Sequence, residues 1–486
     1  MIFGRKKLID IELIKNKLTL KGEQSMNIIL DTDSYKSSHY LQYPKETKGL
    51  FSYLEARWSY GNGSSVIFFG LQYILKKYLE GSVVTKEDVL EAEELFTKHG
   101  EPFNKKGWMY IATELKGYLP LTIKALPEGT KVDLETVLMT IECTNPKCYW
   151  LVTWFETMLM RVWYPITVAT HSHNMKITIK RFLDISSDDP EGQILFKLHD
   201  FGSRGVSSQE TAMIGGMAHL VNFRGTDTVA ALVGVKEYYN FDDMAGFSIP
   251  ASEHSTITSW GKENEARVYE NMIDNFSKPG SLYACVSDSY DLDNAVNNIW
   301  GKQLKDKVIE KGGILVVRPD SGNPITTSIR VVKDLDKHFG STKNNKGYKV
   351  LNNVRVIYGD SMNHSNVEDI LINLTKCGFS ADNMSFGMGA ELLQKVNRDT
   401  YGMAIKVSAI KINNNWINVY KEPKGAPEKA SKKGRLMTYR KENGEFYSAL
   451  EPKNKFDAPM LATVFKDGEI LSEDSFDAIR ARVDEN

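Results

Sequence analysis

One pattern of hydrophobic and polar positions recurs between His199 and Arg398. In each copy a short apolar run rich in β-branched or aromatic residues ends in a polar turn containing glycine, and a helical pattern follows. Five copies are clear and a sixth has a shorter strand; they are LFKLHDFGSRG, HLVNFRGTDT, SLYACVSDSYD, GGILVVRPDSGNP, VRVIYGDS and MSFGMGAELLQKV. Strands alternating with helices predict a parallel sheet, and this series of units favours a (β/α) barrel over an open doubly wound sheet.

The regions before and after this pattern differ from it. Residues 26–165 mix strand and helix patterns, and residues 400–486 read as short strands and turns. A chain of 486 residues exceeds what one hydrophobic core usually serves. We therefore expect an α/β protein with a barrel-like domain over 166–399, a second α+β domain built from 26–165 and 400–486, and an N-terminal extension over 1–25.

The composition excludes several classes of partner. The net charge of −1 lacks the basic excess of a nucleic-acid-binding domain, and no apolar run approaches the roughly 18 residues that span a bilayer. The four cysteines form no C-x-x-C pair, and residues 1–25 lack the apolar core of a signal peptide. We expect a cytoplasmic protein that binds neither nucleic acid nor membrane.

Polar side chains follow the strands of the repeated pattern. The carboxyl ends of parallel strands open onto the ligand site, so their joint placement favours one shared site, although any one of them could be a surface loop residue. Arginines suit phosphate oxygens, and clustered aspartates suit Mg²⁺ or ribose hydroxyls. The pattern therefore predicts a site for a phosphorylated sugar, made by Arg204, Asp227, His254, Asp288, Arg318, Asp320 and Asp360.

Three further features have two interpretations each. The turn from Gly387 to Ala390 enters a helical pattern, which suits a phosphate at a helix N-terminus, but a tight turn without a ligand explains it equally well. His254 in FSIPASEHSTIT has the setting of a nucleophile or proton carrier, with His199 as the competing candidate. The basic segment 421–435 is, on charge alone, a solvated loop.

Ordered segments along nearly the whole chain after Met26 are more specific than any single motif. They include TDSYKSSHYLQYP, KLHDFGSRGVSSQETA, PASEHSTITSWGK, RPDSGNP, LLQKVNRD and SKKGRL. In these segments the chain closely resembles the nicotinamide phosphoribosyltransferases, which belong to the type II phosphoribosyltransferase family. The signature of the type I family, an apolar strand ending in paired acidic residues and a Thr/Gly loop, is absent, which agrees with this interpretation.

The resemblance implies transfer of a phosphoribosyl group from 5-phosphoribosyl-1-pyrophosphate to nicotinamide, giving nicotinamide mononucleotide and pyrophosphate for NAD salvage. It implies Mg²⁺ as a cofactor, ATP as an activating co-substrate that phosphorylates His254, and a homodimer with shared active sites. The alternatives are a nicotinate phosphoribosyltransferase, which takes the acid, and a non-catalytic signalling homologue. Asp227 argues against the first, since a carboxylate repels the acid, and the joint presence of Arg318, Asp320, Asp227 and His254 argues against the second.

The resemblance also implies a role for each matching residue. Asp33 and Tyr35 of one subunit would enter the site of the other, where the pyridine ring would lie between Phe201 and Tyr35 and its carboxamide would bind Asp227. The catalytic positions would be His254, Asp320 and Asp288. Mg²⁺ would lie near Asp288 and the pyrophosphate, and the resemblance leaves the residues that bind Mg²⁺ open. The other contacts would be Arg204 and Arg318 at the ribose and nicotinamide, Gly359, Asp360, Gly389 and Arg398 at the 5-phosphate, and Arg57, Lys406, Lys421 and Lys429 at the pyrophosphate and ATP.

Departures from the family pattern lie close to the phosphates. Ala390 and Glu391 stand where vertebrate-type relatives have glycines, and Ala404 stands where a serine is common. The added negative charge of Glu391 predicts a weaker hold on the 5-phosphate.

Overall fold

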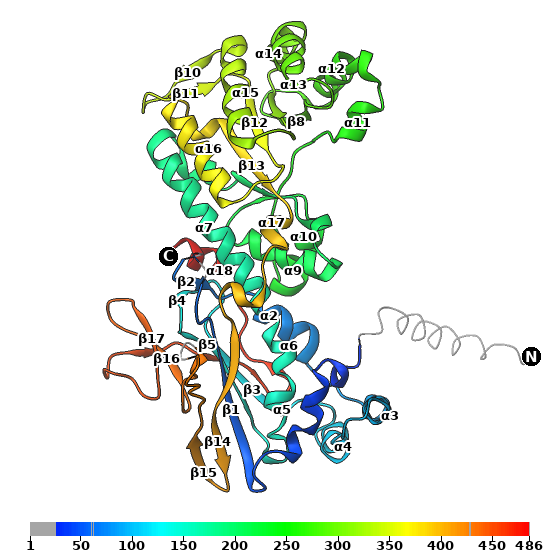
Figure 1. The fold of residues 1–486 in the computed structure, drawn as a ribbon, viewed down its shortest axis with the longest axis vertical. Helices are drawn as coiled ribbons and strands as arrows, with labels where there is room; N and C mark the ends of the chain where they lie inside the picture. Colours follow the sequence, from blue (N-terminus) through cyan, green and yellow to red (C-terminus); the bar gives the residue numbers. More distant parts are fainter. Residues whose placement is uncertain (1–25, 60, 62, 427–428, 486) are drawn as a thin grey trace, which may run out of the picture.

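The computed structural model of the chain describes residues 26–59, 61, 63–426 and 429–485, so the expected extension over 1–25 lies outside the described residues. The molecule is elongated, with a parallel barrel and its helices at one end and an antiparallel sheet at the other (Figure 1). The long helix α7 (Trp163–Ser186) runs from the junction of the two parts along the barrel. The expected domain boundaries stay a prediction, because α7 continues through position 165 without a break.

Each of the six units of the repeated pattern contributes a strand to one parallel sheet. The position expected for the second strand is wrong, because His219 and Leu220 of its apolar run end a helix and the strand comprises only Gly225 and Thr226. The order of the sheet is β7-β6-β13-β12-β9-β8, and every neighbouring pair is parallel. The central residues of β9 and β12 are buried, as expected for strands covered on both faces. The strands are β6 (Leu198–Asp200), β7 (Gly225–Thr226), β8 (Leu282–Val286), β9 (Ile314–Arg318), β12 (Val354–Tyr358) and β13 (Met384–Met388).

A seventh stretch of extended chain, residues 247–251, closes this sheet into a ring, and we call it the closing segment. On one side the Thr226 N–H donates to the Phe247 carbonyl over 3.0 Å, at the edge formed by β7. On the other side the Ala284 N–H donates to the Pro250 carbonyl over 2.9 Å, at the edge formed by β8. Both sheet edges are therefore paired, and the expectation of a barrel-like fold is confirmed.

Helices cover the outside of the ring. In α15 (Pro324–Phe339) the Asn323 side chain caps the first turn by accepting from the N–H groups of Ile325 and Thr326, and Val331 and Leu335 are buried. No helix in the described part of the chain is long and apolar enough to cross a bilayer. The other covering helices are α9 (Gln209–Leu220), α10 (Val229–Tyr239), α12 (Glu265–Phe276), α14 (Lys305–Lys311) and α16 (His364–Lys376).

A seven-stranded antiparallel sheet forms the other end of the molecule, in the order β15-β14-β1-β5-β3-β19-β20. Strands from the C-terminal segment form both of its edges, with β14 next to β1 and β19 next to β3. The strands are β1 (Thr47–Glu55), β3 (Leu121–Ala125), β5 (Val137–Cys143), β14 (Ala404–Ile412), β15 (Asn415–Asn418), β19 (Ala462–Lys466) and β20 (Glu469–Ile470). The helices nearest this sheet are α2 (Leu71–Ile74), α3 (Lys86–His99), α4 (Lys105–Thr113), α5 (Leu151–Trp154), α6 (Glu156–Met160) and α18 (Phe476–Asp484).

A buried carboxyl group joins the two ends of the molecule. Glu128 accepts from the Gln72 N–H over 2.7 Å and from the hydroxyl of Tyr239, on the barrel helix α10, over 2.8 Å. The Glu128 N–H donates to Asp474, which precedes α18, over 2.8 Å. Burial raises the pKa of Glu128 to about 7, because the hydrogen bonds that lower the pKa offset only part of the effect of burial.

Glu128→Gln should reduce the pH dependence of stability. The folded pKa lies above the ordinary value of 4.5, so the folded protein retains a proton that the unfolded chain loses, and stability falls as pH rises from about 4.5 to 7. At pH 8 this cost is up to about 3 kcal/mol. Thermal midpoints at pH 5.5 and pH 8 should therefore differ less in Glu128→Gln than in the wild type, whereas the exposed control Glu445→Gln should behave as wild type. Equal pH dependence in all three proteins would refute this role of Glu128.

Candidate active site at the barrel mouth

The carboxyl ends of the ring strands, which we call the barrel mouth, bring together most of the expected site residues. Three of the aspartates lie close enough to Tyr358, the last residue of β12, for their charges to act on it. Burial raises the pKa of Tyr358 to about 12, and the negative charges of Asp360, Asp320 and Asp288 add to this effect. In strand order the mouth holds Phe201 after β6, Asp227 after β7, His254 after the closing segment, Asp288 after β8, Arg318 and Asp320 at the end of β9, Gly359 and Asp360 after β12, and Gly389 after β13.

Asp227 is held by two donors on the same oxygen. Its Oδ1 lies 2.9 Å from His199 Nε2 and 2.5 Å from Ser248 Oγ, which belongs to the closing segment. Burial alone would raise the pKa of Asp227, but the bonds from His199 and Ser248 and the charge of Arg318 outweigh it and lower the pKa below its ordinary value. Asp227 is therefore an ionised acceptor, and its side chain is 48% exposed.

The Phe201 ring forms one wall of the mouth. A Cβ at Gly387 would lie 1.9 Å from Phe201 Cε2, and a Cβ at Gly359 would lie 3.2 Å from the same atom. The ring therefore lies across the glycines of β13 and the end of β12, where a larger side chain would displace it. The Arg318 guanidinium lies 5.3 Å from the ring centroid, so Phe201 offers a flat apolar surface beside a cation.

A chain of polar contacts links His254 to Arg318. His254 Nε2 lies 3.0 Å from Asp288 Oδ1, and Asp288 Oδ2 accepts from the Asp320 N–H over 3.1 Å. Asp320 Oδ1 in turn accepts from Arg318 Nε and Nη2 at 3.1 and 2.9 Å. Because an ionised carboxylate can only accept, Nε2 of His254 donates to Asp288, while Nδ1 lies 4.0 Å from Asp320 Oδ2. The imidazole is 48% exposed and available to a ligand.

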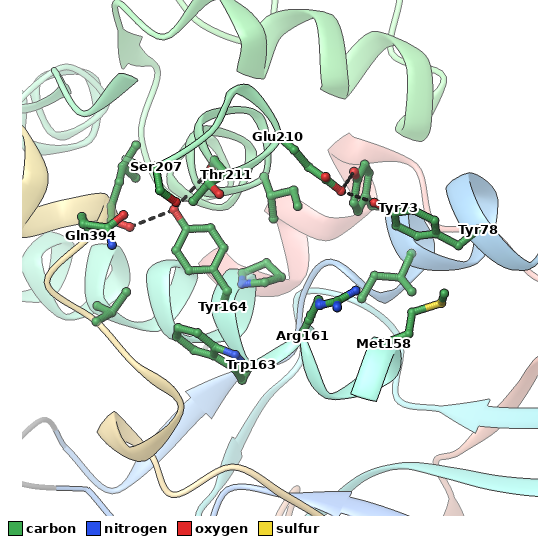
Figure 2. A pocket seen from close by; sticks show the side chains of 15 residues that line it. Tyr73, Tyr78, Met158, Arg161, Trp163, Tyr164, Ser207, Glu210, Thr211 and Gln394 are labelled. Atoms are coloured by element: carbon green, nitrogen blue, oxygen red, sulfur yellow. Dashed lines mark hydrogen bonds between the residues drawn. The ribbon is translucent and has the colours of Figure 1, made fainter. Parts of the chain in front are cut away.

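The expected phosphate turn is packed against the loop that carries Arg204. Gly389 caps α17 (Ala390–Leu393), and a Cβ at Gly205 would lie 3.1 Å from the Cβ of Ala390. Tyr164 fixes the other end of α17 by donating to the Leu393 carbonyl over 2.8 Å, beside a cavity of about 340 Å³ between α7, α9 and α17 (Figure 2).

Glu391, in the same short helix, pairs with Lys395 over 2.7 Å. This ion pair compensates part of the negative charge that Glu391 adds near the phosphate turn. Its expected effect on the 5-phosphate stays a prediction.

The basic residues gather on the antiparallel sheet. Burial lowers the pKa of Lys406, and the positive charges of Arg57, Lys421 and Arg398 lower it further against the opposing charge of Glu156. Arg57 also has a lowered pKa, chiefly from burial. These positive charges repel one another, and a bound polyanion would reduce this repulsion, so the group suits a polyanion such as pyrophosphate. Lys429 is exposed on the same loop as Lys421, which Ser431 closes by hydrogen bonds in both directions with Lys421.

Asp33 and Tyr35 lie apart from the barrel mouth of their own chain. Asp33 accepts from Thr157 Oγ1 over 2.5 Å, and Tyr35 is 56% exposed on a short 3-10 helix, Ser34–Leu41. Among the described residues no hydrogen bond, ion pair or ring contact joins Asp33 or Tyr35 to Phe201 or Asp227. One chain thus assembles the mouth but not these two expected members of the site.

Sequence reasoning missed several residues of the cavity inside the ring. This cavity, of about 450 Å³, extends from Phe201, Asp227 and Ser248 at the mouth to Lys197 and Arg355 at the opposite end. Burial lowers the pKa of Lys197 to about 7. Ser248 carries no signal in the sequence, because one serine in a short extended stretch resembles any loop serine.

The barrel half and the N-terminal part of the chain match two related protein families. Residues 196–469 match the nicotinate phosphoribosyltransferase (NAPRTase) family, and residues 27–123 match the N-terminal domain of nicotinamide phosphoribosyltransferase.

Two solved structures share the fold. Nicotinate-nucleotide pyrophosphorylase from Pyrococcus furiosus has a TM-score of 0.60 at 15% identity, covering 96% of this chain and 97% of that chain. Human nicotinic acid phosphoribosyltransferase has a TM-score of 0.54 at 15% identity, covering 93% of each chain. The fold is that of a type II phosphoribosyltransferase.

Proteins named nicotinamide phosphoribosyltransferase are similar over most of their length. One from Xanthomonas campestris pv. campestris is 48% identical over 463 residues, which are 94% of this chain and 98% of that protein. One from Mycoplasma pneumoniae is 34% identical over 442 residues, which are 84% of this chain and 95% of that protein. The chain belongs to the nicotinamide phosphoribosyltransferase family.

Gly387→Ala tests the position of the Phe201 ring. The added Cβ would overlap the ring, which must rotate out of the mouth. We expect KM for the acceptor substrate to rise at least about tenfold, since a displaced wall no longer orients the acceptor, and stability to fall by about 1–3 kcal/mol. Steady-state kinetics and thermal midpoints measure both effects. A folded Gly387→Ala protein with unchanged acceptor KM would exclude this ring position.

Proposed function

We propose that this chain transfers the phosphoribosyl group of 5-phosphoribosyl-1-pyrophosphate to nicotinamide, giving nicotinamide mononucleotide and pyrophosphate in NAD salvage. The observation that carries this proposal is the ionised Asp227 at the mouth of a cavity walled by Phe201. An acceptor-only carboxylate binds the N–H groups of a carboxamide and repels the carboxylate of nicotinic acid. The 48% identity to a protein named nicotinamide phosphoribosyltransferase supports the same acceptor.

In this reaction the pyridine nitrogen attacks the anomeric carbon while the bond from that carbon to the pyrophosphate oxygen breaks. Positive charge develops on the ribose, and the carboxylates of Asp288 and Asp320 at the mouth stabilise it. Phe201 and Asp227 orient the ring, so that the nitrogen approaches in line with the departing oxygen. No side chain needs to form a bond to the ribose.

The phosphate groups of the donor substrate would bind mainly to basic residues. The departing pyrophosphate gains negative charge, which Arg57, Lys406, Lys421 and Lys429 neutralise. At the ribose end, the 5-phosphate would bind the turn at Gly389 and the strand end at Gly359 and Asp360, with Arg398 as the cationic partner. Arg204 and Arg318 would contact the ribose and nicotinamide, and Asp320 holds Arg318 by two hydrogen bonds.

His254 is the proposed acceptor of a phosphoryl group from ATP. Asp288 takes the Nε2 proton, which leaves the Nδ1 lone pair to attack the γ-phosphorus while the bond to the ADP oxygen breaks. The product is a phosphohistidine and ADP. The new negative charge lies beside Asp288 and Asp320 and favours cation binding there.

Mg²⁺ fits this mouth as an ion held mainly by substrate oxygens. Both oxygens of Asp288 already accept hydrogen bonds, and among the described residues no three His, Cys, Asp or Glu side chains form a metal cluster. Mg²⁺ commonly takes one or two carboxylates and completes its shell with phosphates and water. Asp288 and Asp320 would hold it, and the ion supplies charge neutralisation of the pyrophosphate.

We place the enzyme in the cytoplasm. Its four cysteines, Cys143, Cys148, Cys285 and Cys377, are free thiols. Free thiols persist in reducing compartments.

A homodimer would complete the site. Among the residues that the structure describes, no hydrogen bond, ion pair or ring contact joins Tyr35 or Asp33 to Phe201 or Asp227 of their own chain, and the resemblance assigns both to the mouth of the partner. A second ring over the pyridine, opposite Phe201, would hold the acceptor between two aromatic faces. An electron-poor pyridine stacks well in such a sandwich.

Product analysis tests the proposed function. Purified protein with the phosphoribosyl donor and Mg²⁺ should form mononucleotide from nicotinamide at a rate at least about a hundredfold above that from nicotinic acid. ATP should stimulate the wild type and leave His254→Ala unstimulated. Product from the acid would favour a nicotinate phosphoribosyltransferase, and absence of product from either acceptor would favour a non-catalytic homologue.

Mixed subunits test the shared site. Phe201→Ala and Tyr35→Ala homodimers should each have low activity, because each mouth lacks one ring. After unfolding and refolding together, about one half of the subunits pair as mixed dimers, each with one intact mouth. We expect activity to recover to about a quarter of the wild-type value, because half of the dimers have one of two sites intact. Activity that stays at the level of the separate variants would argue against sites shared between subunits.

A further inference from the structure

We propose that His199 and Ser248 are positioning residues that set the choice between a carboxamide and a carboxylate acceptor. The proposal rests on the proposed function and concerns the same site. It follows from the direction of two hydrogen bonds, both of which end on Oδ1 of Asp227. No hydrogen bond from a described residue reaches Oδ2.

The ring architecture places these three residues together. His199 is the middle residue of β6 and is paired with Gly225 of β7, two positions before Asp227. A Cβ at Gly225 would lie 2.8 Å from His199 Nδ1, so a larger side chain at this position would displace the imidazole. Ser248 follows Phe247, which bridges to Gly225 from the other side. Three adjacent positions of the ring thus converge on one carboxylate.

The Nε2–H of His199 and the hydroxyl of Ser248 both donate to Asp227 and are not available to a ligand. An ionised carboxylate only accepts, so His199 donates its Nε2 proton and Ser248 donates its hydroxyl proton. What these groups still offer to the cavity is Oδ2 of Asp227 and the lone pairs of the Ser248 hydroxyl. Both are acceptors.

An acceptor-only surface discriminates between the two pyridines. The two N–H groups of nicotinamide find two acceptors in Asp227 and Ser248, whereas at these two residues the carboxylate of nicotinic acid meets a negative charge in place of a donor. Loss of either positioning residue changes this balance. Without Ser248 or His199 the carboxylate is free to rotate and more readily takes up a proton, and a protonated Asp227 can donate to nicotinic acid.

The test compares removal of each donor with its replacement. Ser248→Ala and His199→Leu remove a donor, whereas Ser248→Thr and His199→Gln keep one. The control Ser186→Ala removes a buried serine of the same half of the molecule, which donates to Phe182 and accepts from Ala381, away from the mouth. Circular dichroism and thermal midpoints identify variants that fold.

The measured quantity is the ratio of kcat/KM for nicotinamide to kcat/KM for nicotinic acid. We expect it to fall about tenfold in each removal variant and further in the double variant. It should stay near the wild-type value in Ser248→Thr, His199→Gln and Ser186→Ala. KM for the phosphoribosyl donor should change little in all of them.

Calorimetric binding of nicotinamide and of nicotinic acid provides the same comparison without turnover. If the wild type makes no product from nicotinamide, the proposed function fails, and the binding ratio still tests the positioning. A removal variant that weakens both pyridines equally, or leaves the ratio unchanged, overturns the proposal, because a purely structural role would act on both alike.

Discussion

Backbone hydrogen bonds from residues 247–251 to both β7 and β8 hold the parallel sheet closed. Without these pairs the sheet would have two free edges, and its first and last strands would be free to separate. The closing segment also carries Ser248 to Asp227 and leads directly into His254, which then reaches Asp288. The arrangement of the mouth therefore depends on a stretch of chain that makes few sheet contacts of its own.

The mouth and the antiparallel sheet carry opposite charges. Carboxylates of Asp288, Asp320 and Asp360 gather at the mouth, where the proposed reaction places the ribose and its 5-phosphate, whereas the positive charges of Arg57 and Lys421 act on Lys406 at the antiparallel sheet, the proposed site of the pyrophosphate. A reaction in which a sugar gains positive charge and a leaving group gains negative charge needs both sets.

Much of the barrel could be predicted from the sequence, because β8, β9, β12 and β13 are apolar runs followed by a polar turn and a helix. The bounds of β7 could not be predicted, because its two residues, Gly225 and Thr226, carry no apolar signal. The closing segment could not, since Pro250 interrupts its strand pattern and its pairing is long-range. Phe201 and Asp227 follow adjacent strands of the sheet, but the position of the Phe201 ring depends on the glycines at 359 and 387, whose role only packing reveals. The basic segment 421–435 carries no local signal that separates a phosphate site from a solvated loop.

The proposed function places nicotinamide at the Asp227 end of the barrel cavity. A crystal structure of the protein with nicotinamide would show where the ligand lies. We expect the ring against Phe201 and the carboxamide nitrogen about 3 Å from Oδ2 of Asp227. Nicotinamide bound instead beside Lys197 and Arg355 at the opposite end, with the Asp227 end empty, would refute this placement.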